Sequence, residues 1–152
     1  PARVVDRGGR DGCRAPIPWD STPEHGWPGD PWLPFPPESD THDVADEWAD
    51  PASVLGLYQR AIRARHRSPA LAHGDQRLLD APAGVVAWER TSATDRVVVL
   101  VNFTDEAVEL GATEAGAHAD RGTIEVASDG IGEGSILPLR LGPDQAVWVR
   151  PR

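Results

Sequence analysis

Proline constrains this sequence most strongly, because eight of its 15 prolines fall between residues 16 and 37. Proline has no backbone N–H and fixes φ, so this stretch can form neither a helix nor a central strand. A loop of this length inside a compact domain is usually functional or disordered. It contains Trp19, Trp27 and Trp32, whereas disordered segments are poor in aromatic residues. We therefore expect an ordered, irregular loop packed on a scaffold, with a proline-rich linker whose tryptophans bind a partner as the alternative.

A helix is expected over residues 50–67. Asp50 suits the N-cap and Pro51 the first helical position. Apolar residues then recur on one face at spacings of three and four, namely Val54, Leu55, Tyr58, Ala61 and Ile62. Several arginines occupy the last turns, where cations complement the helix dipole, and Ser68-Pro69 ends the helix. The apolar stripe must be buried against another element.

From residue 73 the periodicity changes to that of strands. About seven short strands are predicted, at residues 77–79, 84–90, 96–102, 107–110, 123–126, 135–137 and 145–149. The run 96–102 is almost continuously β-branched, as is typical of a strand buried on both faces. The stretch 111–121, rich in Gly and Ala, is expected to be a loop. Strands at this spacing with no intervening helices predict a small antiparallel β-sandwich.

The charge balance excludes several classes of partner. With 24 acidic and 15 basic residues the net charge is −9, so we expect no binding to nucleic acid, which needs a basic face. No segment approaches the roughly 18 consecutive apolar residues of a membrane span, so we expect no membrane contact. The first residues lack the pattern of a signal peptide, and a single cysteine fits a reducing compartment. We therefore expect a cytoplasmic protein, and the lack of methionine fits a chain cut from a longer one.

Few residues are arranged for catalysis or metal binding. The five histidines are dispersed, with no metal-ligand spacing to cysteine or carboxylates, so no metal and no cofactor is expected. Cys13 has no histidine nearby in the sequence and is expected to be buried or inert. Glycoside chemistry needs a pair of carboxylates, but the sequence does not single out two among 24. The acidic run between residues 40 and 50 is expected to be a solvated face.

Residues 9–14 are more suggestive, because Arg10 and Arg14 flank Asp11 next to the tryptophan-rich loop. The planar fork of arginine grips a carboxylate or the vicinal hydroxyls of a sugar, and tryptophan provides an apolar platform for a sugar face. The combination is compatible with a carbohydrate site. It is equally compatible with a structural Arg–Asp pair that holds an irregular loop in place.

These residues also carry a family resemblance. The segment 9–19, GRDGCRAPIPW, resembles a characteristic stretch of the α-glucosidases of glycoside hydrolase family 13, the α-amylase family, with mild departures at Ala15 and Ile17. The similarity continues in register through PWLP at residues 31–34, the helix start at residues 50–55 and SPAL at residues 68–71. It extends to VVLVNF at residues 98–103, which is similar to a signature strand of the family's β-sandwich.

The resemblance implies a mixed fold, the end of a (β/α)8 barrel followed by an antiparallel β-sandwich. Residues 1–72 would be the terminal part of the catalytic barrel, with residues 1–50 as its eighth βα loop and residues 50–67 as its eighth helix. Residues 73–152 would be the C-terminal sandwich. The helix's apolar stripe would then face a barrel wall, the remainder of the barrel being a partner that this chain does not contain.

The resemblance also implies an activity and a site. The parent would be a retaining α-glucosidase acting on α-glucosides and malto- or isomalto-oligosaccharides. Its catalytic Asp and Glu lie upstream of the matched region, so no catalytic residue is assigned here and the chain alone is expected to be inactive. Arg10 is expected near the non-reducing glucosyl unit, with Asp11 and Arg14 in support of substrate binding. Trp19 and Trp32 are expected to be packing residues rather than sugar platforms.

Two other functions remain open at this point. The chain could be a stand-alone, non-catalytic β-sandwich module that binds carbohydrate or a partner, although such a module has no need for a subsite loop and an amphipathic helix without a complete core. The parent could also catalyse transglycosylation or isomerisation, since close relatives share this architecture.

Overall fold

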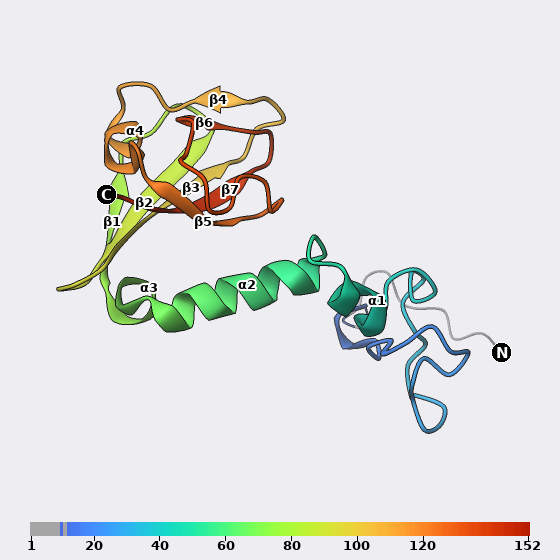
Figure 1. The fold of residues 1–152 in the computed structure, drawn as a ribbon. Helices are drawn as coiled ribbons and strands as arrows, with labels where there is room; N and C mark the ends of the chain where they lie inside the picture. Colours follow the sequence, from blue (N-terminus) through green and yellow to red (C-terminus); the bar gives the residue numbers. More distant parts are fainter. Residues whose placement is uncertain (1–9, 11) are drawn as a thin grey trace. The chain divides into compact units, whose positions relative to one another are not determined.

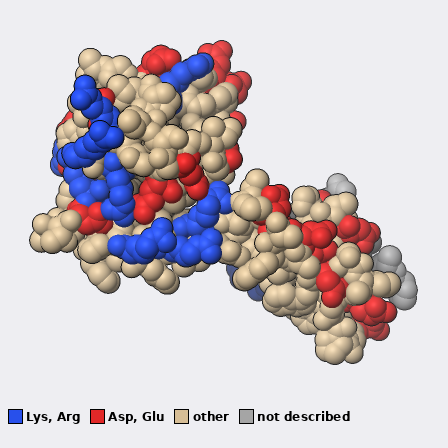
Figure 2. All heavy atoms as spheres, in the orientation of Figure 1, with Lys and Arg blue, Asp and Glu red and all other residues tan. Residues whose placement is uncertain are grey.

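The structure of the protein is a computed structural model that describes residue 10 and residues 12–152. The chain divides after Gly56 into two compact units, the second being Leu57–Arg152. In the described residues no helix is long and apolar enough to cross a membrane. Figure 2 shows acidic side chains over the first unit in this view, whereas arginines and acids intermix over the second.

The first unit is mostly irregular, as the prolines predict. It contains the 3-10 turn η1 (Gly12–Arg14) and the short helix α1 (Val44–Ala49), and residues 16–37 form neither helix nor strand. Backbone turns and contacts between aromatic rings within residues 16–37 stabilise this loop. His25 is buried and its ring lies 4.3 Å from that of Phe35, which also contacts Trp27 edge to face.

The acidic run at residues 40–50 is not simply a solvated face, because two of its carboxylates cap helices. Asp43 is buried and accepts the N–H of Asp46 at 2.9 Å, which makes it the N-cap of α1. Glu47 accepts the N–H of Leu55 at 3.1 Å, at the start of the next helix. Carboxylates at these positions satisfy free amide groups and complement the helix dipole.

Helix α2 (Val54–Arg67) ends where predicted but begins four residues later than the predicted residue 50. Asp50 bonds to the N–H of Ala52 instead, an Asx turn that competes with helix capping. Ser53 takes the capping role and accepts the N–H of Gly56 at 2.9 Å. The expectation that Asp50 is the N-cap is therefore wrong. Ser68-Pro69 ends α2 and also starts helix α3 (Pro69–His73), with Ser68 as its N-cap.

The second unit is built on a five-stranded antiparallel sheet in the order β1-β2-β3-β7-β5, with β4 and β6 as a separate pair (Figure 1). The strands of the large sheet are β1 (Asp75–Leu79), β2 (Val85–Thr91), β3 (Arg96–Asn102), β5 (Thr123–Ala127) and β7 (Ala146–Arg150). The small pair consists of β4 (Val108–Glu109) and β6 (Arg140–Leu141). The fold is thus a mixture of helices and antiparallel strands.

Two local predictions for this unit are wrong. Residues 135–137 are not a strand; Ile136 makes only an isolated bridge to Thr123, and the strand lies later, at β6. The expected loop 111–121 contains helix α4 (Glu114–Ala119), whose N-cap Thr113 accepts the N–H of Gly116. Small residues made α4 hard to detect, because its buried face consists of alanine and glycine and gives no apolar stripe.

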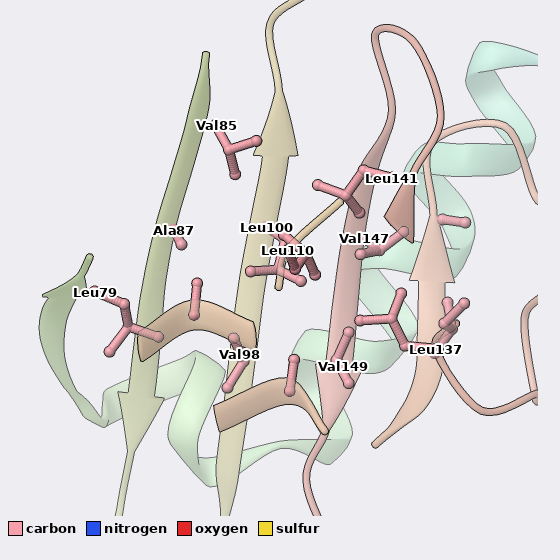
Figure 3. Close-up of a cluster of buried hydrophobic side chains, with 14 residues drawn as sticks. Leu79, Val85, Ala87, Val98, Leu100, Leu110, Leu137, Leu141, Val147 and Val149 are labelled. Carbon is pink, nitrogen blue, oxygen red and sulfur yellow. The ribbon is translucent and has the colours of Figure 1, made fainter. Parts of the chain in front are cut away.

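The core lies on both faces of the large sheet, as predicted for a central strand such as β3. On one face, inward side chains of β2, β3 and β7 pack beneath α4 and the β4–β6 pair (Figure 3). On the other face, Val97 and Val99 pack against Leu71 of α3, with Trp88 and Trp148 alongside. Val97, Val98, Val99 and Leu100 are all buried, which confirms the prediction of a strand covered on both sides.

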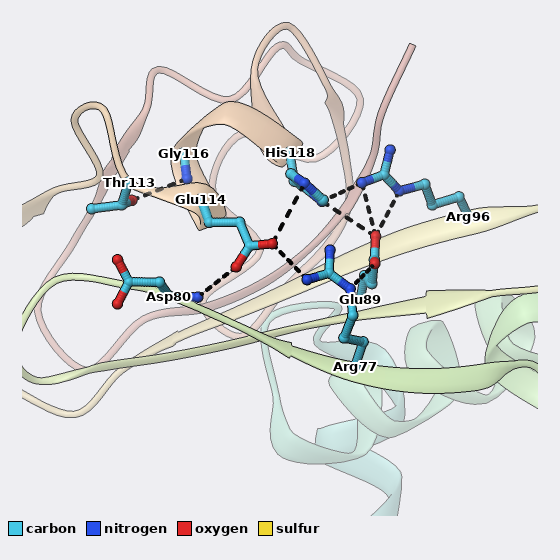
Figure 4. A network of polar contacts seen from close by, with 8 residues as sticks. All are labelled: Arg77, Asp80, Glu89, Arg96, Thr113, Glu114, Gly116 and His118. Atoms are coloured by element: carbon cyan, nitrogen blue, oxygen red, sulfur yellow. Dashed lines mark hydrogen bonds and ion pairs between the residues drawn. The ribbon is translucent and has the colours of Figure 1, made fainter.

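A polar network lies beneath α4 (Figure 4). Glu89 of β2 is buried and accepts hydrogen bonds from Arg77 of β1 at 2.7 Å and Arg96 of β3 at 2.9 Å. Glu114 of α4 accepts from a second nitrogen of Arg77 at 2.5 Å and from the N–H of Asp80 at 3.1 Å. His118 of α4 contacts Glu89 at 3.2 Å and also Arg96. The network therefore ties three strands and a helix together.

Acid is expected to destabilise the second unit through this network. Burial raises the pKa of Glu89, but the hydrogen bonds from Arg77 and Arg96 outweigh it and hold the pKa below its ordinary value. The hydrogen bond from Arg77 likewise lowers the pKa of Glu114. A carboxyl with a depressed folded-state pKa stabilises the fold above its unfolded pKa, and this is lost as the pH falls through the folded value.

Urea unfolding between pH 7 and pH 3 measures this dependence. Glu89→Gln, which removes the charge, is expected to cost about 2 kcal/mol at pH 7 and to flatten the pH profile. Glu109→Gln, at an exposed carboxylate of β4, serves as the matched control and should keep the slope of the parent. A Glu89→Gln profile as steep as that of the parent would show that other groups carry the acid sensitivity.

Candidate functional site

Two of the three predicted site residues, Arg10 and Arg14, lie at the turn η1. Both are exposed, Arg10 before this turn and Arg14 as its last residue, while Asp11 falls outside the described residues. The thiol of Cys13 donates to the carbonyl oxygen of Arg10 at 3.0 Å, so the turn is closed on itself. Cys13 is exposed, so of the two expectations, a buried or an inert thiol, the first is wrong and the second stays a prediction.

A groove of about 650 Å³ begins at Arg14 and runs along the proline-rich loop. Its lining includes Arg14, Ile17, Trp19, Trp27, Asp30 and Trp32, but not Arg10. Within the described residues Trp19 is 50% exposed and Trp32 69% exposed, and their packing in the longer protein stays a prediction. The groove lining therefore includes Arg14 and three tryptophans, whereas Arg10 is not part of it.

A tight turn positions Trp19 in this groove. Asp20 accepts both the N–H and the hydroxyl of Thr22, at 3.0 and 2.5 Å, and these bonds lower the pKa of Asp20. The chain then reverses so that the N–H of Trp19 donates to the carbonyl of His25 at 3.0 Å. Gly26 has a φ of +72°, and a Cβ there would lie 2.9 Å from the Cβ of Trp19. Only glycine allows this close approach without displacing the tryptophan.

Trp27 is fixed on the opposite side of the same turn. Its indole N–H donates to the carbonyl oxygen of Ile17 at 2.8 Å, and its ring contacts Phe35. Trp27 and Asp30 were not identified as site residues from the sequence, since nothing in their spacing distinguishes them from other loop residues. The Pro-Gly and His-Gly pairs at residues 25–29 were the available turn signal.

The described residues contain no group of three or more His, Cys, Asp and Glu placed to hold a metal ion. The groove instead combines the guanidinium group of Arg14 and the carboxylate of Asp30 with the indole rings of three tryptophans. Such a surface can bind a ligand by stacking and hydrogen bonding. It offers no assigned pair of carboxylates for glycosidic bond cleavage.

Comparison with known proteins identifies relatives of this chain. Residues 2–74 match the model of the alpha amylase catalytic domain. A probable alpha-glucosidase of Rhizobium meliloti is 38% identical over 100 residues, which are 65% of this chain and 18% of that protein. An oligo-1,6-glucosidase of Halalkalibacterium halodurans is 34% identical over 97 residues, 62% of this chain and 17% of that protein. The chain thus spans less than a fifth of the length of either enzyme.

Solved structures agree with these matches. The trehalulose synthase MutB of Pseudomonas mesoacidophila MX-45 superposes with a TM-score of 0.76 at 27% identity, over 94% of this chain and 26% of that one. A variant of MutB was solved in complex with its substrate sucrose. By sequence and structure together, this chain is a partial member of the α-amylase family, glycoside hydrolase family 13, related to α-glucosidases and oligo-1,6-glucosidases.

Proposed function

We propose that this chain is the C-terminal portion of a retaining α-glucosidase that hydrolyses terminal α-glucosidic bonds of short oligosaccharides. In this proposal residues 1–72 complete a (β/α)8 barrel, with α2 as its last helix, and residues 73–152 form a C-terminal β-sandwich. Arg10, Asp11 and Arg14 contribute to substrate binding. The catalytic Asp and Glu belong to the upstream part of the barrel, so the 152-residue chain does not hydrolyse glucosides by itself.

The exposed apolar face of α2 is the observation that carries this proposal. Val54, Tyr58 and Ile62 recur at intervals of four residues, and about half or more of each side chain is exposed. An amphipathic helix does not leave such a stripe in water without a partner. The matched family model covers this helix, and this chain spans only 18% of the length of the alpha-glucosidase relative, so most of that enzyme has no counterpart here.

The closed core of the second unit favours a second candidate, a stand-alone module that binds carbohydrate or a partner. The buried side chains of the large sheet are covered on one face of the sheet by α4 and the β4–β6 pair and on the other face by α3. A module of this kind accounts for residues 73–152 but leaves the groove and the stripe of α2 without a role. The enzyme proposal accounts for all three, and we favour it.

Hydrolysis of p-nitrophenyl α-glucoside tests the proposal. The 152-residue chain and the same chain extended upstream to the length of the relatives are purified and assayed in parallel. Activity is expected only in the extended protein, because the nucleophile and the general acid lie upstream. Turnover by the 152-residue chain would contradict the proposal, as would an inactive extended protein that is folded by circular dichroism. Products formed from sucrose or maltose would then separate hydrolysis from transfer or isomerisation.

A further inference from the structure

His25 is buried in the proline-rich loop although its ring carries two polar nitrogens. The residue is 8% exposed, whereas the tryptophans of the same loop are half-buried or exposed. Additional chain in a longer parent protein would cover this ring further and would not expose it. A buried polar group needs a hydrogen-bond partner, so the contacts of the ring indicate what it does.

The contacts of the ring lie within the first unit and define its tautomer. Nδ1 lies 3.3 Å from the carbonyl oxygen of Asp20, and the ring meets that of Phe35 edge to face. Nε2 lies 3.7 Å from the carboxylate of Asp40, but the Asp40 side chain is 89% exposed, and solvent weakens such a pair. A carbonyl oxygen can only accept a hydrogen bond, so Nδ1 carries the hydrogen. Neutral His25 is therefore assigned the Nδ1–H tautomer.

The backbone of His25 closes the turn that holds Trp19. Its N–H donates to the carbonyl of Thr22 at 2.8 Å, and its carbonyl accepts the N–H of Trp19 at 3.0 Å. Its φ is +48°, in the left-handed region where residues other than glycine are uncommon. Such a conformation persists only where the surrounding contacts offset its cost. The bond of the ring to Asp20 and its contact with Phe35 are contacts of this kind.

A stiff segment joins Trp19 to the arginine turn η1. Pro16 and Pro18 have fixed φ values and restrict the residues before them to extended conformations. Helix α1 holds the same end of this segment, because its first two N–H groups donate to the carbonyl oxygens of Pro18 and Trp19 at 3.0 and 3.1 Å. Arg14 lies at the other end, as the last residue of η1. The position of the arginine turn therefore depends on how firmly Trp19 is held.

We propose that His25 is a positioning residue for the substrate-binding segment. The bond from its Nδ1–H to the Asp20 carbonyl stabilises the turn that fixes Trp19, and through Trp19 it positions the arginines at η1. The assignment rests on the proposed function, which gives Arg10 and Arg14 a part in substrate binding. His25 acts through the loop and does not touch the substrate. Its loss therefore weakens substrate binding and leaves the catalytic groups of the upstream barrel in place.

The tautomer of His25 tests the anchoring bond in the 152-residue chain. Long-range proton–nitrogen NMR spectra of the histidine rings are recorded at about pH 8.5, where a histidine of ordinary pKa is neutral. His25 is expected to show the Nδ1–H form. His42, which is exposed in the same unit, serves as the control and should show a mixture of both forms. An Nε2–H form at His25 would overturn the proposal.

Three substitutions separate the hydrogen bond from the ring and from the backbone conformation. Asparagine places an amide donor near the position of Nδ1 and tolerates a positive φ, phenylalanine keeps the ring without the donor, and glycine tolerates only the φ. Hydrogen exchange of the Trp19 amide reports on the turn. Exchange in His25→Asn should stay within about threefold of the parent, whereas in His25→Phe and His25→Gly it should be about tenfold faster.

Kinetics of the upstream-extended protein show whether this turn serves substrate binding. His25→Phe and His25→Gly are expected to lower kcat/KM for p-nitrophenyl α-glucoside about tenfold, mainly through KM, and His25→Asn to keep it within about threefold of the parent. A role limited to ring packing predicts the opposite order, with His25→Phe closer to the parent than His25→Asn. His42→Asn, the matched control, should stay within about twofold.

Parental kinetics in all three His25 variants, or a higher kcat/KM in His25→Phe than in His25→Asn, would overturn the positioning role. An extended parent protein that is folded but inactive would instead overturn the proposed function. In that case the tautomer of His25 and the exchange rate of the Trp19 amide still decide whether His25 holds the turn.

Discussion

Replacing Arg10 with alanine in the upstream-extended protein is expected to lower kcat/KM for α-glucosides about 100- to 1,000-fold. Arg10 is exposed and lies two residues before η1, in the segment of the sequence that resembles family 13 α-glucosidases. If it grips the terminal glucosyl unit with its planar fork, alanine removes several charge-assisted hydrogen bonds at once. Steady-state kinetics with p-nitrophenyl α-glucoside and a disaccharide measure the loss.

Two further variants make this prediction specific. Arg10→Lys keeps the charge but not the fork, so its kcat/KM should fall between those of Arg10→Ala and the parent. Arg63→Ala removes an exposed arginine from α2 and should leave kcat/KM within about twofold. Arg10→Ala with near-parental kinetics would mean that Arg10 holds the loop rather than the substrate, which is the structural role that the sequence alone left open.

The sequence predicts most reliably where a residue type acts locally. The prolines between residues 16 and 37 exclude regular structure whatever surrounds them, and the β-branched run at residues 96–102 forms the central strand β3. The end of α2 likewise follows from Ser68-Pro69. In each case the backbone chemistry of the residues themselves determines the outcome.

Predictions fail where non-local contacts decide. Strand β6 exists because Arg140 and Leu141 pair with β4, some thirty residues earlier, and a two-residue strand leaves almost no periodicity to detect. Helix α4 is stabilised by the core beneath Ala115 and Ala119 rather than by an apolar stripe of large residues. Asp50 and Ser53 compete for one helix start, and the Asx turn at Ala52 decides between them.

For the site, too, local residue types were predictable from the sequence and non-local contacts were not. The segment around Arg10 and Arg14 stands out in the sequence, but the groove depends on the turn at residues 20–26, where Gly26 adopts a positive φ and brings the backbone against Trp19. No pattern in the sequence predicts that Trp27 and Asp30 line the groove. Residue types thus indicate the chemistry of the loop, and the turn geometry determines which of them lie together.

Replacing Leu100 with alanine is expected to destabilise the second unit by about 3–4 kcal/mol. Leu100 lies in the middle of β3, opposite Ala87 on β2 and Val147 on β7, and its side chain is fully buried between the sheet and Leu110 (Figure 3). Alanine removes most of its apolar surface and leaves a cavity that a sheet bonded on both sides of β3 cannot close. Urea unfolding followed by tryptophan fluorescence measures the change.

Leu78 provides a matched control on the same sheet. It lies on the edge strand β1 with 68% of its surface exposed, so Leu78→Ala is expected to change the free energy of unfolding by less than about 0.5 kcal/mol. The two substitutions delete the same atoms, and only burial differs between them. Equal effects would mean that β3 is not the centre of the core. A large effect of Leu100→Ala alone would establish that the second unit has a core of its own, with β3 at its centre.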